Sequence, residues 1–544
     1  MRNADANRAA ATNGVSGTPW WKGAVIYQVY PRSFQDSGGD GIGDLPGITS
    51  RLGYIRDLGV DGIWVSPFYR SPQDDFGYDV ADHCDVDPLF GTLEDFDQLI
   101  ARAHELELKV VVDQVYSHTS DRHTWFEQSR SGREGERSDW YIWADARDDG
   151  SPPNNWLSVF GGPAWTWDAR RRQYYMHNYL ASQPDLNLHN PAVQDALLDI
   201  ARFWLDRGVD GMRLDAINYG MHDPDLTDNP PASPSMWSDA RPWLMQRKRY
   251  NTNHPAMPAF LARLSSTAAD YGDILTVAEV GGDDALSTMH AYTQGDDRLS
   301  TAYGFDFLSC RGSVAGKVHE VMTAWPDEPG AGWPSWAFSN HDAPRVVSRW
   351  ETAQSPAERA QLYMLLLMCL RGSVFVYQGE ELGLPQAEIP FEQLRDPEGI
   401  ANWPLSLGRD GARTPMPWEA ELTHAGFSSN DPWLPVPEEH RALAADRQMA
   451  QENSVLNSSK RLIALRNTLP ALRTGSIRFL DAPHHLLAFI REAGDTRLLC
   501  VFNLGEQDVE WHAPVDVVEN VEQLGAASPD GKFASYSAHV SLIR

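Results

Sequence analysis

The sequence has few of the features that mark membrane-spanning, secreted or nucleic-acid-binding proteins. No run reaches about 18 uninterrupted apolar residues, so we expect no bilayer span. The N-terminus has no apolar signal peptide, and the four cysteines show no metal-ligand spacing. Lys and Arg number only 46 against 75 Asp and Glu, a net charge of −29. Because this surface repels phosphate and anionic lipid, we expect a neutral small-molecule substrate and no nucleic-acid or membrane partner. From the lack of a signal-like stretch and of a bilayer span we expect a cytoplasmic protein.

The sequence does have the length and the aromatic content of a large folded protein. Its 544 residues, with 42% hydrophobic side chains, are enough for about two to four domains. Short β-branched or aromatic runs alternate with helical patterns, as in α/β proteins with a parallel sheet. The runs are 25–30, 62–66, 109–115, 211–214, 275–279, 335–338 and 373–377. The clearest helical patterns lie at 93–108, 191–207 and 355–370.

Two loop-rich stretches and a change of pattern near the C-terminus predict the domain organisation. Residues 116–187 are rich in Trp, Gly, Asn and Pro, and the tail alternates as antiparallel strands do. The predicted units are a loose arm (1–19), a first βα part (20–115), an inserted B domain (116–187), a second βα part with a loop-rich subdomain at about 379–431 (188–474), and a C-terminal antiparallel β domain (475–544).

Three carboxylates stand at the ends of predicted strands: Asp215 in G-M-R-L-D-A, Glu279 in T-V-A-E-V and Asp342 in F-S-N-H-D. Barrel enzymes place their chemistry at the C-terminal ends of parallel strands. Arg213 shares a strand face with Asp215, so its guanidinium would keep that carboxylate ionised. Glu279 has no cation nearby in sequence, which suits a protonated carboxyl. The set predicts glycoside cleavage by a carboxylate pair.

Several motifs resemble, in order, those of the α-amylase superfamily, glycoside hydrolase family 13. They are D-Q-V-Y-S-H, Q-P-D-L-N, G-M-R-L-D-A, A-E-V and F-S-N-H-D. The segments Y-Q-G-E-E-L-G and G-R-D-G-A-R-T-P-M-P-W are similar to the oligo-1,6-glucosidase/α-glucosidase branch. The resemblance covers about residues 20–540. It implies a (β/α)8 TIM barrel formed by the two βα parts, with a B domain inserted after the third strand and a C-terminal β domain.

The resemblance also implies a retaining, exo-acting mechanism. Asp215 would be the nucleophile, Glu279 the acid/base and Asp342 the group that grips the glucose hydroxyls. Asp79 and Arg413 would clamp the 4-hydroxyl and close the pocket, and Tyr78 would stack on the sugar. Further substrate contacts are expected from His118, Gln183, Arg213, Ala216 and His341.

A metal site is predicted in D-S-G-G-D-G-I-G-D, which reads like a calcium-binding loop. Asp36, Asp40, the Ile42 carbonyl and Asp44 stand at the oxygen-donor positions. We expect one structural calcium or magnesium ion there, with a solvated acidic turn as the alternative. Ser117 replaces the Asn that helps to bind calcium in amylases, so no ion is expected at that position. No organic cofactor is expected.

Linkage preference depends on Ala216, directly after the predicted nucleophile. In this branch Val accompanies α-1,6 activity, whereas Ala accompanies α-1,4. We therefore expect hydrolysis of maltose and short oligosaccharides, with transfer of glucose to acceptors as a second outcome. The polar segment 219–255 would fold over the pocket mouth and limit substrate length.

Other functions stay open at this stage. Oligo-1,6-glucosidase, sucrose hydrolase and trehalose synthase share the fold, and the protein could be a monomer or a homodimer. A non-catalytic, transporter-partner protein is disfavoured, because the chain has all three carboxylates and no membrane span.

Overall fold

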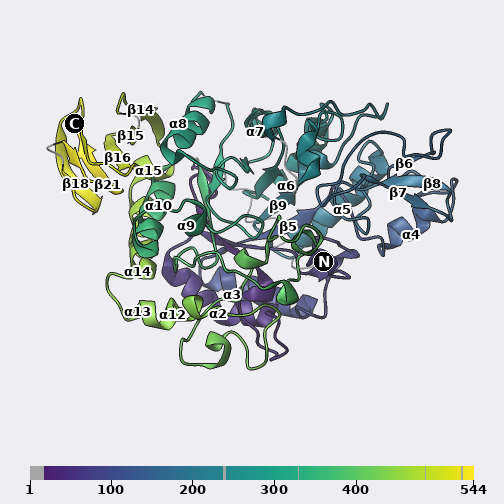
Figure 1. Cartoon of the computed structure of the whole chain (residues 1–544), viewed down its shortest axis with the longest axis horizontal. Coiled ribbons are helices and arrows are strands. Elements are labelled where there is room, and N and C mark those ends of the chain that lie inside the picture. The colour runs from purple at the N-terminus through teal and green to yellow at the C-terminus, as the bar shows by residue number, and fades with distance from the viewer. Residues whose placement is uncertain (1–16, 237–240, 329, 484, 529–530) are drawn as a thin grey trace.

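The computed structural model contains a closed barrel of parallel strands (Figure 1). It describes residues 17–236, 241–328, 330–483, 485–528 and 531–544, so residues 1–16 of the predicted arm lie outside the described residues. In chain order the barrel strands are β1 (Val25–Val29), β2 (Gly62–Val65), β5 (Lys109–Val115), β9 (Gly211–Asp215), β10 (Leu275–Val280), β11 (Thr301–Gly304), β12 (Ser335–Ala337) and β13 (Ser373–Tyr377). The predicted (β/α)8 fold is confirmed.

Closure of the barrel involves the two strands at the ends of the hydrogen-bonded order. The order is β11-β10-β9-β5-β2-β1-β13-β12. A parallel bridge between Ala302 and Pro334 joins β11 to the start of β12, and the Ser335 hydroxyl donates to the Ala302 carbonyl at 3.0 Å. All eight strands therefore point their C-terminal ends to one rim, the usual place for function in this fold.

A helix follows each barrel strand and covers the outside of the sheet. These helices are α2 (Leu45–Leu58), α3 (Leu93–Glu105), α5 (Pro191–Asp206), α6 (Met257–Ala269), α7 (Ala285–Thr293), α8 (Val314–Ala324), α10 (Pro356–Cys369) and α14 (Val455–Thr468). The start signals in the sequence are used as predicted. Asn190 caps α5 by accepting from the Ala192 N–H, and Ser355 forms a capping box with Glu358 at the start of α10.

The segment between β5 and α5 forms a small unit with its own core. It contains α4 (Thr124–Arg130) and a sheet of β6 (Trp143–Ala144), β8 (Gln173–Met176) and β7 (Trp165–Asp168) in that order. Trp156, Trp165 and Met176 are buried together in this unit. The aromatic side chains of this segment, which show few helical patterns in sequence, therefore form the core of a compact inserted domain.

The C-terminal part is an antiparallel sheet, as the alternating pattern predicts. Its order is β14 (Ser476–Phe479), β15 (Leu486–Ala493), β16 (Thr496–Asn503), β21 (Ser537–Ile543) and β18 (Val517–Leu524). A smaller sheet of β17 (Val509–Glu510), β20 (Lys532–Phe533) and β19 (Ala527–Ser528) accompanies it. Figure 1 shows this sheet and the inserted unit at opposite ends of the long axis, with the barrel between them.

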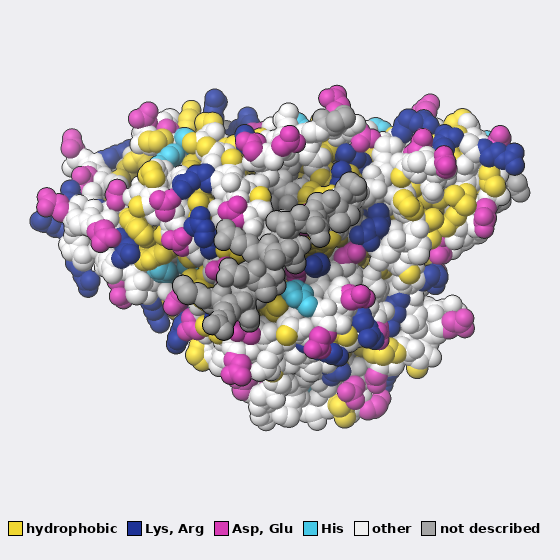
Figure 2. Space-filling model, turned by 180° about the vertical axis from the view of Figure 1, so that it is seen from behind, with side chains coloured by type: hydrophobic (Ala, Val, Ile, Leu, Met, Phe, Trp, Pro, Cys, Tyr) yellow, Lys and Arg dark blue, Asp and Glu magenta, His cyan; other side chains and the backbone are white. Residues whose placement is uncertain are grey.

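The surface mixes charges of both signs. Figure 2 shows Asp and Glu side chains interspersed with Lys and Arg over one face, rather than gathered in a patch of one sign. Among the described residues, no helix combines the length and apolar character needed to cross a bilayer.

Candidate active site

Arg213 joins three carboxylates at the C-terminal rim of the barrel. Its Nη1 lies 2.8 Å from Asp113 Oδ1 and 2.6 Å from Asp215 Oδ1, and its Nη2 forms an ion pair with Glu279. All four side chains are buried or nearly so. The register explains the assembly, because Arg213 pairs with Asp113 on β5 and with Val277 on β10, two residues before Glu279. The predicted contact between Arg213 and Asp215 is confirmed.

Three buried carboxylates around one guanidinium cannot all be ionised without a large electrostatic free-energy cost. Burial raises the pKa of Asp215 and of Glu279 to about 7 and that of Asp113 to about 6. Arg213 opposes the shift, but each carboxylate repels the others. The group therefore holds a proton near neutral pH, and an ionised carboxylate beside a protonated one can act as nucleophile and acid.

Glu279 is held by contacts that its sequence neighbours do not reveal. Oε1 accepts from the Tyr303 hydroxyl at 2.8 Å, and Oε2 accepts from the Ala216 N–H at 3.1 Å. Glu279 has no cation near it in sequence, but Arg213 contacts it from the neighbouring strand. Its protonated state is supported all the same, but by burial and by repulsion from Asp215 rather than by the absence of a cation.

Ala216 adopts a left-handed backbone conformation, with φ 39° and ψ 36°. A non-glycine residue in this region costs about 1–3 kcal/mol. Here the conformation turns the Ala216 N–H toward Glu279 immediately after Asp215 ends β9. The strain is therefore located where it orients the second carboxylate.

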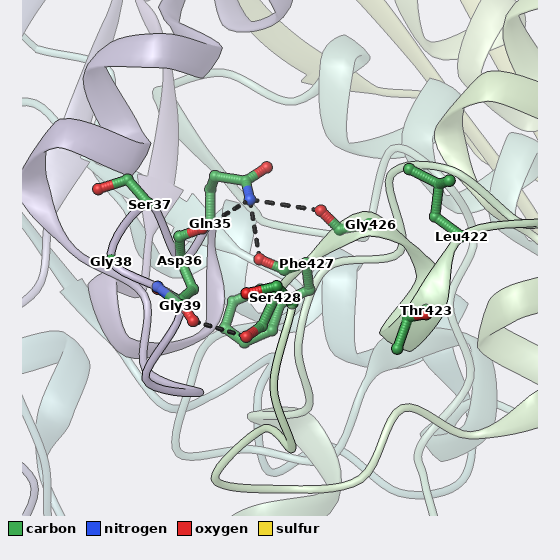
Figure 3. Close-up of a pocket in the computed structure, with 11 residues that line it drawn as sticks. Gln35, Asp36, Ser37, Gly38, Gly39, Leu422, Thr423, Gly426, Phe427 and Ser428 are labelled. Atoms are coloured by element: carbon green, nitrogen blue, oxygen red, sulfur yellow. Dashed lines mark hydrogen bonds between the residues drawn. The ribbon is translucent and has the colours of Figure 1, made fainter.

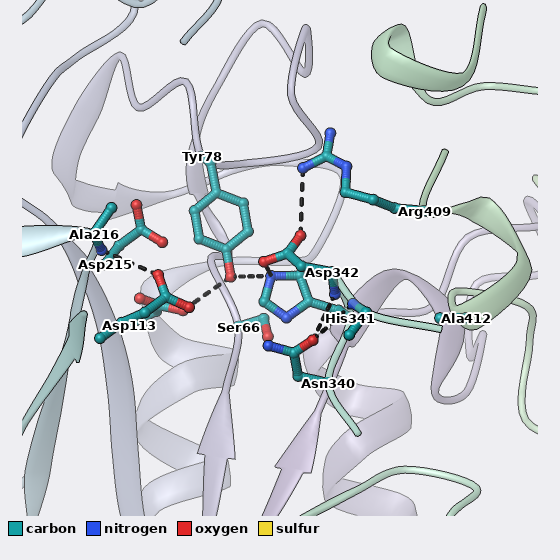
Figure 4. A network of polar contacts seen from close by, with 12 residues as sticks. Ser66, Tyr78, Asp113, Asp215, Ala216, Asn340, His341, Asp342, Arg409 and Ala412 are labelled. Carbon is teal, nitrogen blue, oxygen red and sulfur yellow. Dashed lines mark hydrogen bonds and ion pairs between the residues drawn. The ribbon is translucent and has the colours of Figure 1, made fainter. Parts of the chain in front are cut away.

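Asp342 lies in a second cluster that contains Arg409 and Arg413, and Figure 4 shows it beside Arg409 and His341. Its Oδ1 lies 2.8 Å from Arg413 Nη2 and 3.4 Å from Arg409 Nη1, and its Oδ2 lies 3.3 Å from His341 Nε2. Burial opposes ionisation, yet His341 and the two arginines hold the pKa of Asp342 below the usual range of an aspartate. Asp342 is consequently an ionised acceptor, suited to accepting hydrogen bonds from hydroxyl groups.

Arg409 also pairs with Asp75 and with Asp396. Its Nη2 is 2.7 Å from Asp75 Oδ1 and 2.8 Å from Asp396 Oδ1. Asp75 and Arg409 were missed from the sequence, although Arg409 stands within G-R-D-G-A-R-T-P-M-P-W and Asp75 only four positions before Asp79. Their separation by 334 positions gives no local signal of the pairing.

The predicted clamp between Asp79 and Arg413 is not formed. Asp79 accepts from the Ser71 hydroxyl at 2.8 Å and from the N–H groups of Asp74 and Asp75 at 2.9 and 3.0 Å. Its carboxylate therefore holds the turn that presents Asp75. Arg413 instead donates to Asp342 and to the His341 carbonyl, so the ion pair at this end is made by Asp75 and Arg409.

Tyr78 and His341 link the two clusters. The Tyr78 hydroxyl lies 3.1 Å from Asp113 Oδ2 and 2.6 Å from His341 Nε2, and the two rings are nearly parallel with centroids 5.2 Å apart. Burial lowers the pKa of His341 to about 3, so the imidazole is neutral. Both residues lie at the site as predicted, and the only ring in contact with Tyr78 among the described residues is that of His341.

His118 and Gln183 extend the second cluster toward the inserted domain. Gln183 Nε2 donates to Asp75 Oδ2 at 3.1 Å and lies 3.2 Å from His118 Nε2. Burial lowers the pKa of His118 to about 4. The structure thus brings both predicted residues to the site and connects them through Asp75 to Arg409.

Aromatic residues surround the mouth of the site. The Arg409 guanidinium lies 5.0 Å from the centroid of the Phe160 ring, and Phe160, Tyr179 and Tyr219 follow one another in ring contact. In the described part of the segment 219–255, Asn251 donates to Asn178 Oδ1 at 2.8 Å, next to Tyr179, and Arg241 pairs with Glu398 at 2.8 Å. Trp237 of this segment lies outside the described residues.

The predicted metal loop borders a cavity of about 480 Å³ (Figure 3). Asp36 accepts from the N–H groups of Gly39 and Gly41, and Asp44 accepts from Ser37 and Gly47. A Cβ placed at Gly38 would lie 3.8 Å from an oxygen of each carboxylate, so the two face a common space.

The remaining predicted ligands do not complete a site. Asp40 accepts from the Ile42 N–H at 2.9 Å. Across the part of the chain that the structure describes, no group of three or more His, Cys, Asp or Glu side chains is positioned to hold a metal. Occupancy of the loop by an ion stays a prediction.

Comparison with known proteins matches most of the chain. Residues 28–475 match the family model described as alpha amylase, catalytic domain, and residues 477–524 match the maltogenic amylase C-terminal domain. A probable alpha-glucosidase of Rhizobium meliloti is 50% identical over 516 residues, covering 94% of each chain. An oligo-1,6-glucosidase of Heyndrickxia coagulans is 37% identical and covers 97% of this chain and 100% of its own.

Solved structures of similar enzymes also superpose on most of the chain. An alpha-glucosyl transfer enzyme superposes with a TM-score of 0.92 at 48% identity, covering 97% of this chain and 100% of its own. The trehalulose synthase of Pseudomonas mesoacidophila superposes with a TM-score of 0.87 at 30% identity over the same shares.

Proposed function

We propose that this chain, which belongs to the α-amylase catalytic-domain family, glycoside hydrolase family 13, removes terminal α-1,4-linked glucose with retention of configuration. Its relatives make it a glycoside hydrolase of the α-glucosidase type. The observation that carries the proposal is the guanidinium of Arg213, which contacts both Asp215 and Glu279. One cation between the two carboxylates favours the short separation that a retaining mechanism requires.

In the first step an oxygen of Asp215 attacks the anomeric carbon of the terminal glucose. The glycosidic oxygen leaves with the proton of Glu279, and a covalent β-glucosyl ester remains on Asp215. Among the described residues none donates a hydrogen bond to Asp215 Oδ2, while Oδ1 is held by Arg213. The unheld oxygen is the one that we assign to the attack.

In the second step Glu279, now ionised, takes a proton from water or from a sugar hydroxyl. The resulting oxygen nucleophile displaces Asp215 and releases α-glucose or a new α-glucoside. The Tyr303 hydroxyl and the Ala216 N–H stay bonded to Glu279 in both of its charge states, so its carboxyl keeps its position between the two steps.

The second cluster forms the closed end that makes the enzyme exo-acting. Asp342, Asp75 and the two arginines would receive the hydroxyls of one glucose, whose oxygens can both donate and accept. Ionised Asp342 holds those hydroxyls more strongly as charge develops on the ring. With Arg409 crossing from Asp75 to Asp396, no room for a second sugar is expected beyond this point.

Ala216 supports a preference for α-1,4 linkages, since its backbone N–H contacts Glu279 and its small side chain leaves room beside the catalytic pair. The competing function is α-1,6 cleavage, favoured by the similarity to oligo-1,6-glucosidases at 34–37% identity. The higher identity to a probable alpha-glucosidase supports the first assignment.

The test is glucose release from maltose, isomaltose, sucrose and trehalose, measured side by side. We expect the highest kcat/KM with maltose and α-glucose as the first anomer detected by NMR. The highest kcat/KM with isomaltose would reverse the linkage assignment, and β-glucose as the first product would overturn the double displacement.

We also propose that a calcium or magnesium ion binds the Asp36–Asp44 loop, supported by the two carboxylates that face the space beside Gly38. Isothermal titration of the chelator-treated protein with each cation tests this, using Asp44→Asn as the variant. Binding that is absent from the wild type, or unchanged in the variant, would contradict it.

A further inference from the structure

Lys248 is a buried lysine in the chain segment that follows β9 and its nucleophile Asp215. It follows the 3-10 helix η4 (Pro242–Met245) and is only 7% exposed. Its ammonium lies 4.1 Å from the centroid of the Trp243 ring and 5.0 Å from that of Tyr219. The amine is therefore enclosed between two aromatic rings, where cation–π attraction replaces part of its hydration.

The ammonium has donors that the protein does not use. It carries three N–H groups, and its one hydrogen bond to another described residue runs to the Tyr219 hydroxyl at 3.3 Å. No carboxylate of the described residues comes within 4.0 Å of it. Burial lowers its pKa to about 7, against the attraction of Asp283 and Asp185. A buried amine with two unsatisfied N–H donors carries a desolvation free-energy cost, which a ligand that accepts hydrogen bonds from these donors would offset.

The position of Tyr219 relates Lys248 to the catalytic acid. Tyr219 ends the short helix η2 (Ile217–Tyr219), which begins two residues after Asp215. Gly281, two residues after Glu279, lies against it: a Cβ at Gly281 would be 3.9 Å from Tyr219 Cε2. Asn218 donates to the Gly281 carbonyl at 2.8 Å and fixes this approach.

Lys248 thus approaches the catalytic acid through Tyr219, from outside the second cluster. It makes no contact with Asp342, Arg409 or Arg413, which form the closed end. Glucose occupies that closed end in the proposed function, so the leaving group extends past Glu279 toward Tyr219, Trp243 and Lys248. The apolar rings match the faces of a sugar, and the amine matches its hydroxyl oxygens.

We propose that Lys248, with Tyr219 and Trp243, forms the leaving-group subsite and donates a hydrogen bond to a hydroxyl oxygen of the departing or accepting sugar. The proposal rests on the α-glucosidase function above and adds a selectivity to it. Leaving groups that carry hydroxyls, such as the second glucose of maltose, use the amine. A phenyl leaving group offers no oxygen acceptor and gains only the ring contacts.

The alternative role is purely structural, with Lys248 fastening its own chain segment by its contacts with the two rings. A fastening role would affect every substrate that depends on the segment. A recognition role affects only substrates whose leaving group accepts the hydrogen bond, so a comparison of two substrates separates the two roles.

The experiment compares Lys248→Met with wild type on maltose and on phenyl α-glucoside. Methionine keeps the length and the apolar stem but has no donor. We expect kcat/KM for maltose to fall on the order of ten- to a hundredfold, the effect of losing a hydrogen bond from a charged donor, while that for phenyl α-glucoside changes less than about twofold. Transfer of glucose to a glucose acceptor should fall with maltose hydrolysis.

Two controls complete the test. Arg247→Met removes the neighbouring cation, whose side chain is 57% exposed, and should leave both substrates unchanged. Lys248→Arg keeps a donor and should recover part of the maltose activity. The melting temperature of each variant verifies that the fold is intact.

Equal loss on both substrates, or no loss on either, would overturn the subsite assignment. A Lys248→Met protein that does not fold leaves Lys248→Arg and Lys248→Gln for the same comparison, with a smaller maltose-specific loss expected in each because both keep a hydrogen-bond donor. If wild type cleaves neither maltose nor phenyl α-glucoside, the proposed function itself fails, an outcome distinct from failure of the subsite.

Discussion

Two clusters of buried carboxylates meet in this pocket, and their protonation differs because their cation content differs. Around Arg213, three carboxylates share one guanidinium, and the pKa of both Asp215 and Glu279 rises to about 7. Around Asp342, three carboxylates share Arg409 and Arg413, and the pKa of Asp342 falls.

The comparison separates burial from charge balance as causes. Both clusters are desolvated, and burial alone would raise every carboxylate pKa. For Asp342 the attraction of His341, Arg413 and Arg409 together outweighs burial and reverses the direction, whereas burial still keeps the pKa of Asp75 in the same cluster raised. In the cluster with one cation, Glu279 can keep a proton and donate it to the leaving group. In the cluster with two cations, Asp342 stays ionised and can accept hydrogen bonds from sugar hydroxyls. This division of roles is the basis of the following predictions.

The largest effect is expected from Asp215→Asn, which removes the nucleophile but keeps the shape of the first cluster. We expect kcat on maltose to fall on the order of 10⁴-fold or more, because no covalent intermediate can form. Glucose release in a coupled assay measures it. Retention of more than about one per cent of wild-type activity would rule out Asp215 as the nucleophile.

The next effect is expected from Arg409→Met, which gives the second cluster a single cation. Loss of its ion pairs with Asp75, Asp396 and Asp342 should lower kcat/KM on the order of 10²-fold. The acidic limb of the pH profile should move upward as the pKa of Asp342 rises.

A matched control is Arg130→Met, whose ion pair with buried Asp168 at 2.7 Å lies in the inserted domain. It should change kcat/KM by less than about twofold. Equal losses in the two variants would show that any broken ion pair, rather than the cation count of the pocket, reduces activity.

The pH profile of kcat/KM should report the proton of the first cluster. Since the pKa of Glu279 is about 7, the acid is protonated below this pH and activity should decline about tenfold per unit above it. Below the optimum, activity should fall as a further proton binds to the group that contains Asp215. A flat profile from pH 6 to 9 in stopped assays would contradict a titrating acid.

The smallest effects are expected on stability, with opposite signs in the two clusters. The folded-state pKa of Glu279 is raised, so ionisation above pH 7 costs stability, and Glu279→Gln should raise the melting temperature at pH 8. The folded-state pKa of Asp342 is lowered, so its ionised form stabilises the fold above the unfolded pKa of about 4, and Asp342→Asn should lower the melting temperature.

Each shift should be a few degrees, on the order of 1–3 °C, and calorimetry at pH 8 and pH 5 measures it. At pH 5 the effect of Glu279→Gln should shrink, because the wild-type carboxyl is already protonated in the folded state. If Glu279→Gln and Asp342→Asn shifted the melting temperature in the same direction at pH 8, the two clusters would not differ in protonation as described.

The sequence was sufficient for the barrel and for the three rim carboxylates. Asp215 and Glu279 stand at or next to the ends of hydrophobic strands, and the caps Asn190 and Ser355 each lie directly before the helix whose start they fix. Such local patterns determine which residues lie at the rim, because all parallel strands end there.

Contacts between different strands or between different loops could not be predicted from local sequence patterns. Arg213 reaches Glu279 through the register of β9 and β10, which no single segment encodes. Asp75 and Arg409 meet from two loops, and the sequence favoured Asp79 and Arg413, each a few positions away. A shift of four positions in a loop changes the partner completely, whereas on a strand the alternation of faces constrains the choice.

The most direct test of the difference between the clusters is infrared difference spectroscopy of the carboxyl groups between pH 6 and pH 8. Wild type should have protonated-carboxyl absorption that titrates near pH 7, to which Glu279, Asp215 and other buried carboxyls contribute. The wild-type-minus-variant difference spectrum should show the loss of one such component in Glu279→Gln and no such loss in Asp342→Asn, whose carboxylate is ionised throughout this range. Loss of the component in Asp342→Asn but not in Glu279→Gln would place the proton in the wrong cluster and contradict the assignment of the acid.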